Sequence, residues 1–145
     1  MKQPQTIAEH LENYLQTTGA PDMIRNHPDI KACFFDGSFA FVDSIVNPET
    51  REPDPKRIAD VFLELHNYYH FVPYEGGMLN KIFLQGSADV PAEALNAFKI
   101  IFISGAQATA GFITEGTFTN FNFNRLDAVI DELNDIVRER LTHIN

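Results

Sequence analysis

Two histidines, His66 and His70, lie one helical turn apart in the sequence. At this spacing both imidazoles can face one side of a helix and bind the same metal ion, such as zinc. Two ligands do not complete a metal site, and the sequence has no His-Glu-x-x-His arrangement. The adjacent Tyr69 and Phe71 indicate an aromatic packing face instead. We therefore expect no metal and no cofactor, and keep a small metal-binding protein or enzyme that uses His66, His70 and Glu75 as the alternative function.

Other residues with catalytic potential show weaker patterns. Arg138 and His143 fit the arginine–histidine spacing of small helical ribonucleases, but this spacing is frequent by chance. Ser38, Ser87 and Ser104 lack the Gly-x-Ser-x-Gly surroundings of an activated nucleophile. The sequence therefore predicts no catalytic residue, and we expect that the protein is not an enzyme.

A double glycine, Gly76-Gly77, stands in the middle of the chain. Such a pair could hold a phosphate at the N-terminus of a helix. The preceding Glu75 disfavours an anion, and neither a Gly-x-Gly-x-x-Gly motif nor a Lys-Ser/Thr pair follows. We expect instead a structural turn, in which Gly76 and Gly77 supply positive φ where one helix reverses into the next.

The most concrete functional signal is a row of carboxylates near the C-terminus. Five acidic residues lie on the solvent side of a predicted helix, and we expect them to bind a partner: Asp127, Asp131, Glu132, Asp135 and Glu139. Four of them recur at every fourth position, which places them about 6 Å apart along a helix axis. This row is comparable to the phosphates along a DNA strand, although Arg138 and Arg140 interrupt its end. An ordinary solvated helix face would look the same, and this alternative stays open.

Composition limits the class of protein. The chain has 145 residues, about the size of one domain, with 44% hydrophobic residues and 13 phenylalanines for a core. Its single cysteine, Cys33, allows no internal disulfide and, beside Phe34 and Phe35, is expected to be a buried and inert thiol. No stretch reaches the roughly 20 uninterrupted apolar residues of a membrane span, and no signal sequence is evident. We expect a cytoplasmic protein that binds no membrane.

The net charge of −9, from 20 acidic against 11 basic residues, bears on the partner. A charge of this sign repels phosphate backbones, which disfavours direct binding to nucleic acid. It favours fast encounter with a basic protein. Many soluble proteins are acidic without using the charge, so the balance alone does not decide the function.

Capping residues and apolar periodicity predict helices in the first half of the chain. Thr6 and Glu9 form a capping box that begins a helix to about residue 18. Asp54 and Pro55 begin another helix, which ends at about Phe71. Between them, residues 30–46 are ambiguous. They predict either a short β-hairpin over 31–42, with Asp36-Gly37 as its turn, or a helix capped by Ser38, and we favour the helix.

Similar signals continue in the second half. Residues 78–84 predict a short helix, and Asp89 can cap a buried central helix in which Gly105 could mark a break. Asn124 is expected to cap the last helix, which runs to about Leu141. The preceding segment from Phe118 to Phe123 is rich in phenylalanine and could form a homodimer interface.

Residues 60 to about 112 resemble a family of bacterial domains of unknown function that includes a DNA-mimic protein. The resemblance lies in the double glycine, Phe83, the Gly86-Ser87 turn and the run Glu93-Ala94-Leu95. The sequence departs from the family pattern at Glu75, Met78 and Asn80, and one extra residue stands in the Pro-Ala-Glu run. The resemblance implies a mostly helical fold and a binding role, in which carboxylates occupy the basic groove of a DNA-binding protein.

Taken together, these signals predict one compact, mostly α-helical domain over residues 1–145, with five to seven helices. We expect a non-enzymatic, acidic protein-binding module that inhibits or neutralises a basic partner. This partner would be a DNA-binding protein, a defence nuclease or a toxin, so that the protein would act as a DNA mimic or as an immunity or anti-defence protein.

Overall fold

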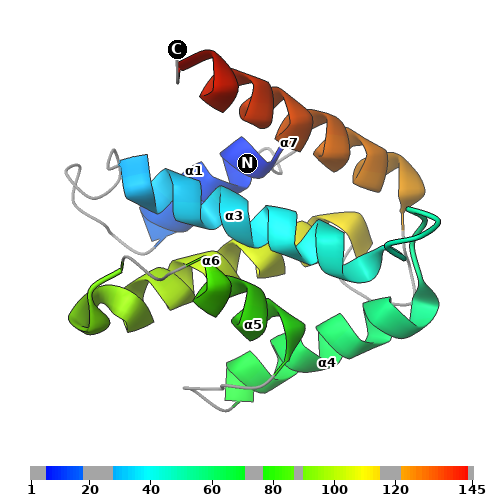
Figure 1. The fold of residues 1–145 in the computed structure, drawn as a ribbon, viewed down its shortest axis with the longest axis horizontal. Coiled ribbons are helices and arrows are strands. Elements are labelled where there is room, and N and C mark those ends of the chain that lie inside the picture. Colours follow the sequence, from blue (N-terminus) through cyan, green and yellow to red (C-terminus); the bar gives the residue numbers. More distant parts are fainter. Residues whose placement is uncertain (1–5, 18–27, 71–76, 87–89, 115–121, 144–145) are drawn as a thin grey trace.

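Helices make up most of the chain that the structure describes. The computed structural model describes residues 6–17, 28–70, 77–86, 90–114 and 122–143. Within these ranges it contains six helices and no strand, and the helices are α1 (Ile7–Thr17), α3 (Pro28–Ile45), α4 (Pro55–His70), α5 (Met78–Gln85), α6 (Ala92–Thr114) and α7 (Phe123–His143) (Figure 1). The prediction of a single, mostly helical domain is confirmed.

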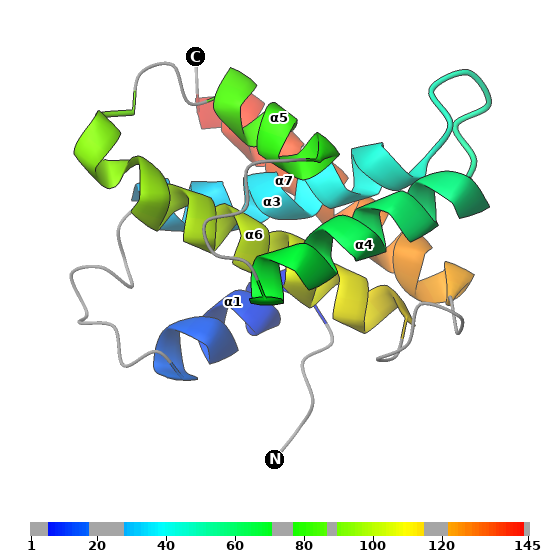
Figure 2. The ribbon, with the colours of Figure 1, turned by 90° about the horizontal axis from the view of Figure 1, so that it is seen from below.

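Helices α3 and α6 form the centre of the fold. Each of the two contacts every other helix in the described part of the chain. Helices α7 and α4 lie on opposite sides of α3, as the two perpendicular views show (Figures 1 and 2). The core of the fold consists mainly of aliphatic and aromatic side chains. Its largest fully buried apolar side chains are Phe34, Phe41, Ile7, Leu15, Ile45, Leu79, Ile113 and Val129.

Two glycines explain how closely α3 and α6 approach. A Cβ atom added to Gly37 on α3 would clash with the carbonyl oxygen of Phe102 on α6. A Cβ atom added to Gly105 on α6 would clash with the carbonyl oxygen of Phe34 on α3. The two backbones are therefore in direct contact at two points, which only glycine allows.

Residues 30–45 are helical, as favoured, but the hairpin alternative and the predicted start of the helix are wrong. There is no hairpin at Asp36-Gly37, and the helix does not begin at Ser38, because α3 starts at Pro28 and continues through all three residues. Ser38 is fully buried in mid-helix, where its Oγ shares a hydrogen bond of 2.5 Å with Oγ1 of Thr109 on α6. Gly37 serves packing between helices rather than a turn. Gly105 likewise lies inside an unbroken α6, so it marks no break.

The start of α4 follows its sequence signal. The Asp54 side chain accepts a hydrogen bond of 2.9 Å from the backbone N–H of Lys56, and Pro55 is the first helical residue. The predicted cap is therefore confirmed. The segment before it is tightened by Asn47, whose side-chain oxygen accepts from the backbone N–H of Glu49 at 2.8 Å. This segment returns the chain from the end of α3 to the start of α4.

The start of α7 differs from its prediction by two residues. Asn122, rather than Asn124, is the cap, because its side-chain oxygen accepts a hydrogen bond of 3.1 Å from the backbone N–H of Arg125. Its backbone carbonyl also accepts from the N–H of Leu126. Asparagine is suitable at both positions, and the periodicity of the apolar residues does not separate them. The predicted cap at Asp89 lies outside the described residues.

Helix α6 contains a stretch that meets the criteria for a membrane span. Residues Ala97–Thr114 are long and apolar enough by length and composition, and half of this stretch is buried inside the fold. Length and apolar composition are also typical of the central helix of a soluble protein. These two criteria therefore do not distinguish a membrane span from a core helix in α6. The predicted cytoplasmic location without membrane binding stays a prediction.

Candidate functional site

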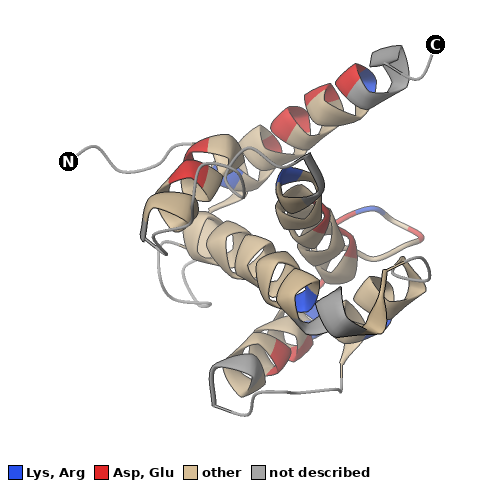
Figure 3. Ribbon diagram, turned by 90° about the vertical axis from the view of Figure 1, so that its left-hand side faces the viewer, with Lys and Arg blue, Asp and Glu red and all other residues tan. Residues whose placement is uncertain are grey.

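The acidic row on α7 faces solvent. Asp127, Asp131, Asp135 and Glu139 are all exposed, whereas Leu126, Val129 and Leu133 of the same helix are buried in the core. Acidic residues recur along the helix that leads to the C-terminus (Figure 3). Because one face of α7 is anchored by apolar packing, the helix holds the four carboxylates in a fixed row on its other side.

An ion pair modifies this row near its end. Nη1 of Arg138 lies 3.1 Å from Oδ1 of Asp135, one helical turn earlier. The two side chains are 77% and 72% exposed. An ion pair this exposed contributes little to stability and competes with water on both sides, so Asp135 stays accessible to a partner.

Glu132 has a different role from the four residues around it. Its Oε1 accepts a hydrogen bond of 2.7 Å from the backbone N–H of Ile7, and its Oε2 accepts one of 3.0 Å from that of Ala8. Thr6 completes this arrangement, since its Oγ1 accepts from the N–H of Glu9 at 3.1 Å. The first three N–H groups of α1 are thus all bonded. Glu132 is committed to joining α7 to α1, and we leave it out of the acidic surface.

His10 lies next to this cap. Burial lowers the pKa of His10 from its usual 6.5, while the charges of Glu132 and Glu9 offset part of this effect. Its ring packs edge-on against Phe112, with centroids 5.6 Å apart. Nε2 is buried and has no hydrogen-bond partner among the described residues. This histidine is therefore held in a site that favours its neutral form.

The double glycine was predicted to form a structural turn. Gly77 has φ of 95°, in the region that favours glycine, and directly precedes α5. A Cβ atom there would clash with the side chain of Glu64 on α4. Glu64 is only 4% exposed, and its two oxygens accept from the N–H groups of Leu79 and Asn80 at 2.9 and 3.0 Å. Gly76 lies outside the described residues.

This geometry gives α5 its start. The carboxylate of Glu64 occupies the position where an external anion would bind at the N-terminus of the helix. Sequence reasoning did not find the role of Glu64. The sequence feature that could have indicated this role is the position of Glu64 on the apolar face of α4, beside Val61 and Leu65.

Within the described residues, the weaker candidates for chemistry do not come together in one site, and Glu75 lies outside those residues. His66 is exposed on α4, and the side chain of His70 lies outside the described part. The described residues contain no group of three His, Cys, Asp or Glu residues that could hold a metal ion. Burial and the nearby charge of Asp36 raise the pKa of the Cys33 thiol to about 12, so it is a poor nucleophile.

Two further candidates fall partly or wholly outside the described residues. Of the phenylalanine-rich segment, Phe123 is 60% exposed at the start of α7, and residues 118–121 are not described. The side chain of His143, one half of the arginine–histidine pair, is not described either. The homodimer interface stays a prediction.

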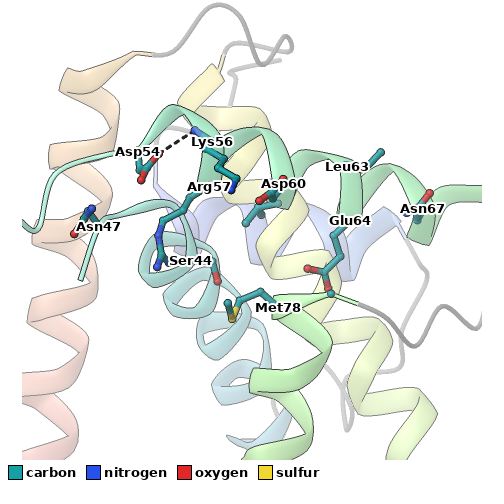
Figure 4. Close-up of a pocket in the computed structure, with 12 residues that line it drawn as sticks. Ser44, Asn47, Asp54, Lys56, Arg57, Asp60, Leu63, Glu64, Asn67 and Met78 are labelled. Atoms are coloured by element: carbon teal, nitrogen blue, oxygen red, sulfur yellow. Dashed lines mark hydrogen bonds between the residues drawn. The ribbon is translucent and has the colours of Figure 1, made fainter. Parts of the chain in front are cut away.

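A groove that sequence reasoning did not anticipate lies beside α4. It has a volume of about 650 Å³ and is lined by the end of α3, the segment after it, α4 and the start of α5 (Figure 4). Both cationic and acidic side chains line it, among them Arg57 and Asp60. Local sequence signals could not reveal it, because the groove depends on how α4 packs against the end of α3 and the start of α5.

No protein-family model, curated protein or solved structure matches the chain. Its function is therefore inferred from its own residues. Two features stand out among them, namely the exposed acidic row on α7 and the mixed-charge groove beside α4.

Proposed function

We propose that this chain is an acidic, non-enzymatic protein-binding module that engages a basic partner through α7. The observation that supports it is the row of four exposed carboxylates, Asp127, Asp131, Asp135 and Glu139, on a helix whose opposite face is buried. Hereafter this row is called the acidic row. It excludes Glu132, which is bonded to α1.

The physical basis is a rigid display of negative charge. Residues four apart on an α-helix are separated by about 6 Å along its axis, so the acidic row places four charges within about 18 Å. Like charges at this spacing repel each other, and a cationic surface that binds them relieves the repulsion. The net charge of −9 adds long-range attraction that speeds encounter.

The partner that fits this surface is a protein with a basic groove. A DNA-binding protein, a nuclease or a toxin that acts on nucleic acid presents cations spaced for phosphates, and carboxylates can occupy the same places. The resemblance of residues 60–112 to the family that includes a DNA mimic agrees with this choice. The protein would then act in the cytoplasm as an inhibitor or an immunity protein, in place of the nucleic acid.

The test compares two triple variants of equal charge. The first, Asp127→Asn with Asp131→Asn and Glu139→Gln, neutralises most of the acidic row. The second, Asp43→Asn with Glu49→Gln and Glu52→Gln, removes three exposed charges from other places. Both are used, with the wild type, to capture proteins from the native host and then to titrate the captured partner at increasing salt.

We expect the first variant to lose the basic partner and the second to retain it, with wild-type affinity falling steeply as salt rises. Equal affinity of the two variants would show that only net charge matters. Binding that is independent of salt would exclude an electrostatic role of the acidic row. Either result would refute the proposal.

A further inference from the structure

The groove beside α4 is separate from the acidic row. Helices α4 and α7 lie on opposite sides of α3 (Figures 1 and 2). The volume of about 650 Å³ lies in the range of small-molecule sites. The lining combines polar groups from the segment around Asn47 and Asp54 with apolar groups from Val61 and Met78. A ligand in this groove would therefore contact both a polar and an apolar wall.

Arg57 is the most informative residue of the groove. Its side chain is half-buried and points from α4 toward the end of α3, near Ser44 (Figure 4). Within the described part of the chain it forms no hydrogen bond and no ion pair. A guanidinium has five N–H donors in a planar fork, and a half-buried one normally finds an acceptor. The arrangement therefore leaves a place for an oxyanion, which could accept two hydrogen bonds.

The nearby carboxylates do not accept hydrogen bonds from the guanidinium of Arg57. Glu64 lines the groove, but both of its oxygens are bonded to the first turn of α5. Asp54 is bonded through one oxygen to the N–H of Lys56. Asp60 lies three residues after Arg57 on α4 and forms no ion pair with it. These acids do, however, make the groove unfavourable for a ligand with several negative charges, so a single carboxylate fits better than a phosphate.

The apolar side of the groove specifies the rest of the ligand. Val61 is buried at its base, and Met78 is 45% exposed at the start of α5. Leu63, also among the lining residues, is 61% exposed. Methionine is flexible and adapts to apolar ligands of different shapes. An aliphatic chain that covered these side chains would gain stability from the apolar surface it removes from water.

We propose that this groove binds a small monoanionic carboxylic acid with an aliphatic tail. The carboxylate pairs with the guanidinium of Arg57, and the tail lies against Val61 and Met78. The site is an open groove rather than a closed cavity, so the ligand exchanges rapidly with solvent. This inference does not depend on the binding of a basic partner by α7.

The test uses hexanoate as the probe and backbone amide NMR as the readout. We expect saturable shifts of the amides of residues 56–64 and 77–79 when hexanoate is added to the full chain. Hexanol lacks the charge and acetate lacks the tail, so both should bind at least several-fold more weakly. Inorganic phosphate should bind no more tightly than acetate.

Two variants of equal charge locate the anion. Arg57→Gln should weaken hexanoate binding about tenfold, the order expected for a lost charge-assisted pair. Lys81→Gln removes an exposed cation of α5 that does not line the groove, and should bind as the wild type does. Thermal unfolding of both variants checks that the fold is intact.

Three results would overturn the proposal. The first is equal binding of hexanoate and hexanol, which would show an apolar surface without an anion site. The second is an affinity of the Arg57→Gln variant for hexanoate that equals that of the wild type. The third is tighter binding of phosphate than of hexanoate to the wild type. The triple variant of the acidic row should bind hexanoate unchanged, so failure of one proposal is distinguishable from failure of the other.

Discussion

Oε1 of Glu132 on α7 accepts a hydrogen bond of 2.7 Å from the backbone N–H of Ile7 on α1, across 125 residues of sequence. Glu64 on α4 caps α5 in the same way, through the N–H of Leu79 at 2.9 Å. In both cases a glutamate from one helix satisfies the N-terminal N–H groups of another and carries charge of the sign that the helix dipole favours. The two glutamates thus fix helices α1 and α5, which are the shortest described helices, to longer ones.

Removal of the cap on α1 should destabilise the protein. We expect Glu132→Ala to lower the free energy of unfolding by about 1–2 kcal/mol, because two N–H groups lose a charged acceptor. The measurement is urea unfolding followed by circular dichroism. Asp131→Ala, an exposed acid on the same helix, is the matched control and should change the free energy by less than about 0.5 kcal/mol. Equal effects of the two substitutions would contradict the assignment of Glu132 as a cap.

A side chain at Gly77 should disturb the start of α5. Gly77→Ala must place a Cβ atom at φ of 95° and against Glu64, and we expect a loss of about 2–4 kcal/mol in unfolding free energy. In a Glu64→Ala background the clash disappears and only the backbone cost is left. The double variant should therefore be more stable than the sum of the two single effects predicts. If the effects of Gly77→Ala and Glu64→Ala on the free energy of unfolding were strictly additive, the predicted clash between the two positions would be wrong.

The contact between α3 and α6 offers a similar comparison of two glycines in one helix. Gly105→Ala should cost about 1–3 kcal/mol or more in unfolding free energy, because its Cβ atom would meet the backbone of Phe34. Gly111→Ala, at an exposed position of α6 with no atom within 4 Å, should instead stabilise the protein by about 0.5–1 kcal/mol. Thermal or urea unfolding of both variants measures the difference, and a loss at Gly111 as large as that at Gly105 would contradict the packing.

His10 should make stability depend on pH below neutrality. Burial lowers its pKa in the folded state below the 6.5 of the unfolded chain, so the unfolded state binds the proton more readily. The contribution of His10 is complete above pH 6.5 and is lost as the pH falls through the lower, folded-state value. We expect unfolding free energies between pH 7.5 and about pH 5 to decline more steeply for the wild type than for His10→Phe, which keeps a ring against Phe112. Parallel curves would exclude this role of His10.

The sequence alone was sufficient to predict the helical class and the starts of α1, α4 and α5. Thr6 and Asp54 cap α1 and α4 as predicted, because a cap depends on residues within one turn of each other. Apolar periodicity likewise predicted helices in the segments of α1 and α4, and in α7 it separated a solvent face from a buried one, since period and burial are linked along a single helix. The exposure of the acidic row follows from the same periodicity.

Only the tertiary structure decided how the special residues are used. Gly37 fits a hairpin turn by local rules, and it lies in mid-helix because α6 approaches α3 there. Glu132 is indistinguishable in sequence from its acidic neighbours, and its bonding to α1 depends on where the chain begins its first helix. The groove around Arg57 is lined by consecutive elements between residues 44 and 78, and it exists because α4 packs beside the end of α3 and the start of α5. Contacts between helices depend on positions far apart in the chain, and local periodicity does not encode them.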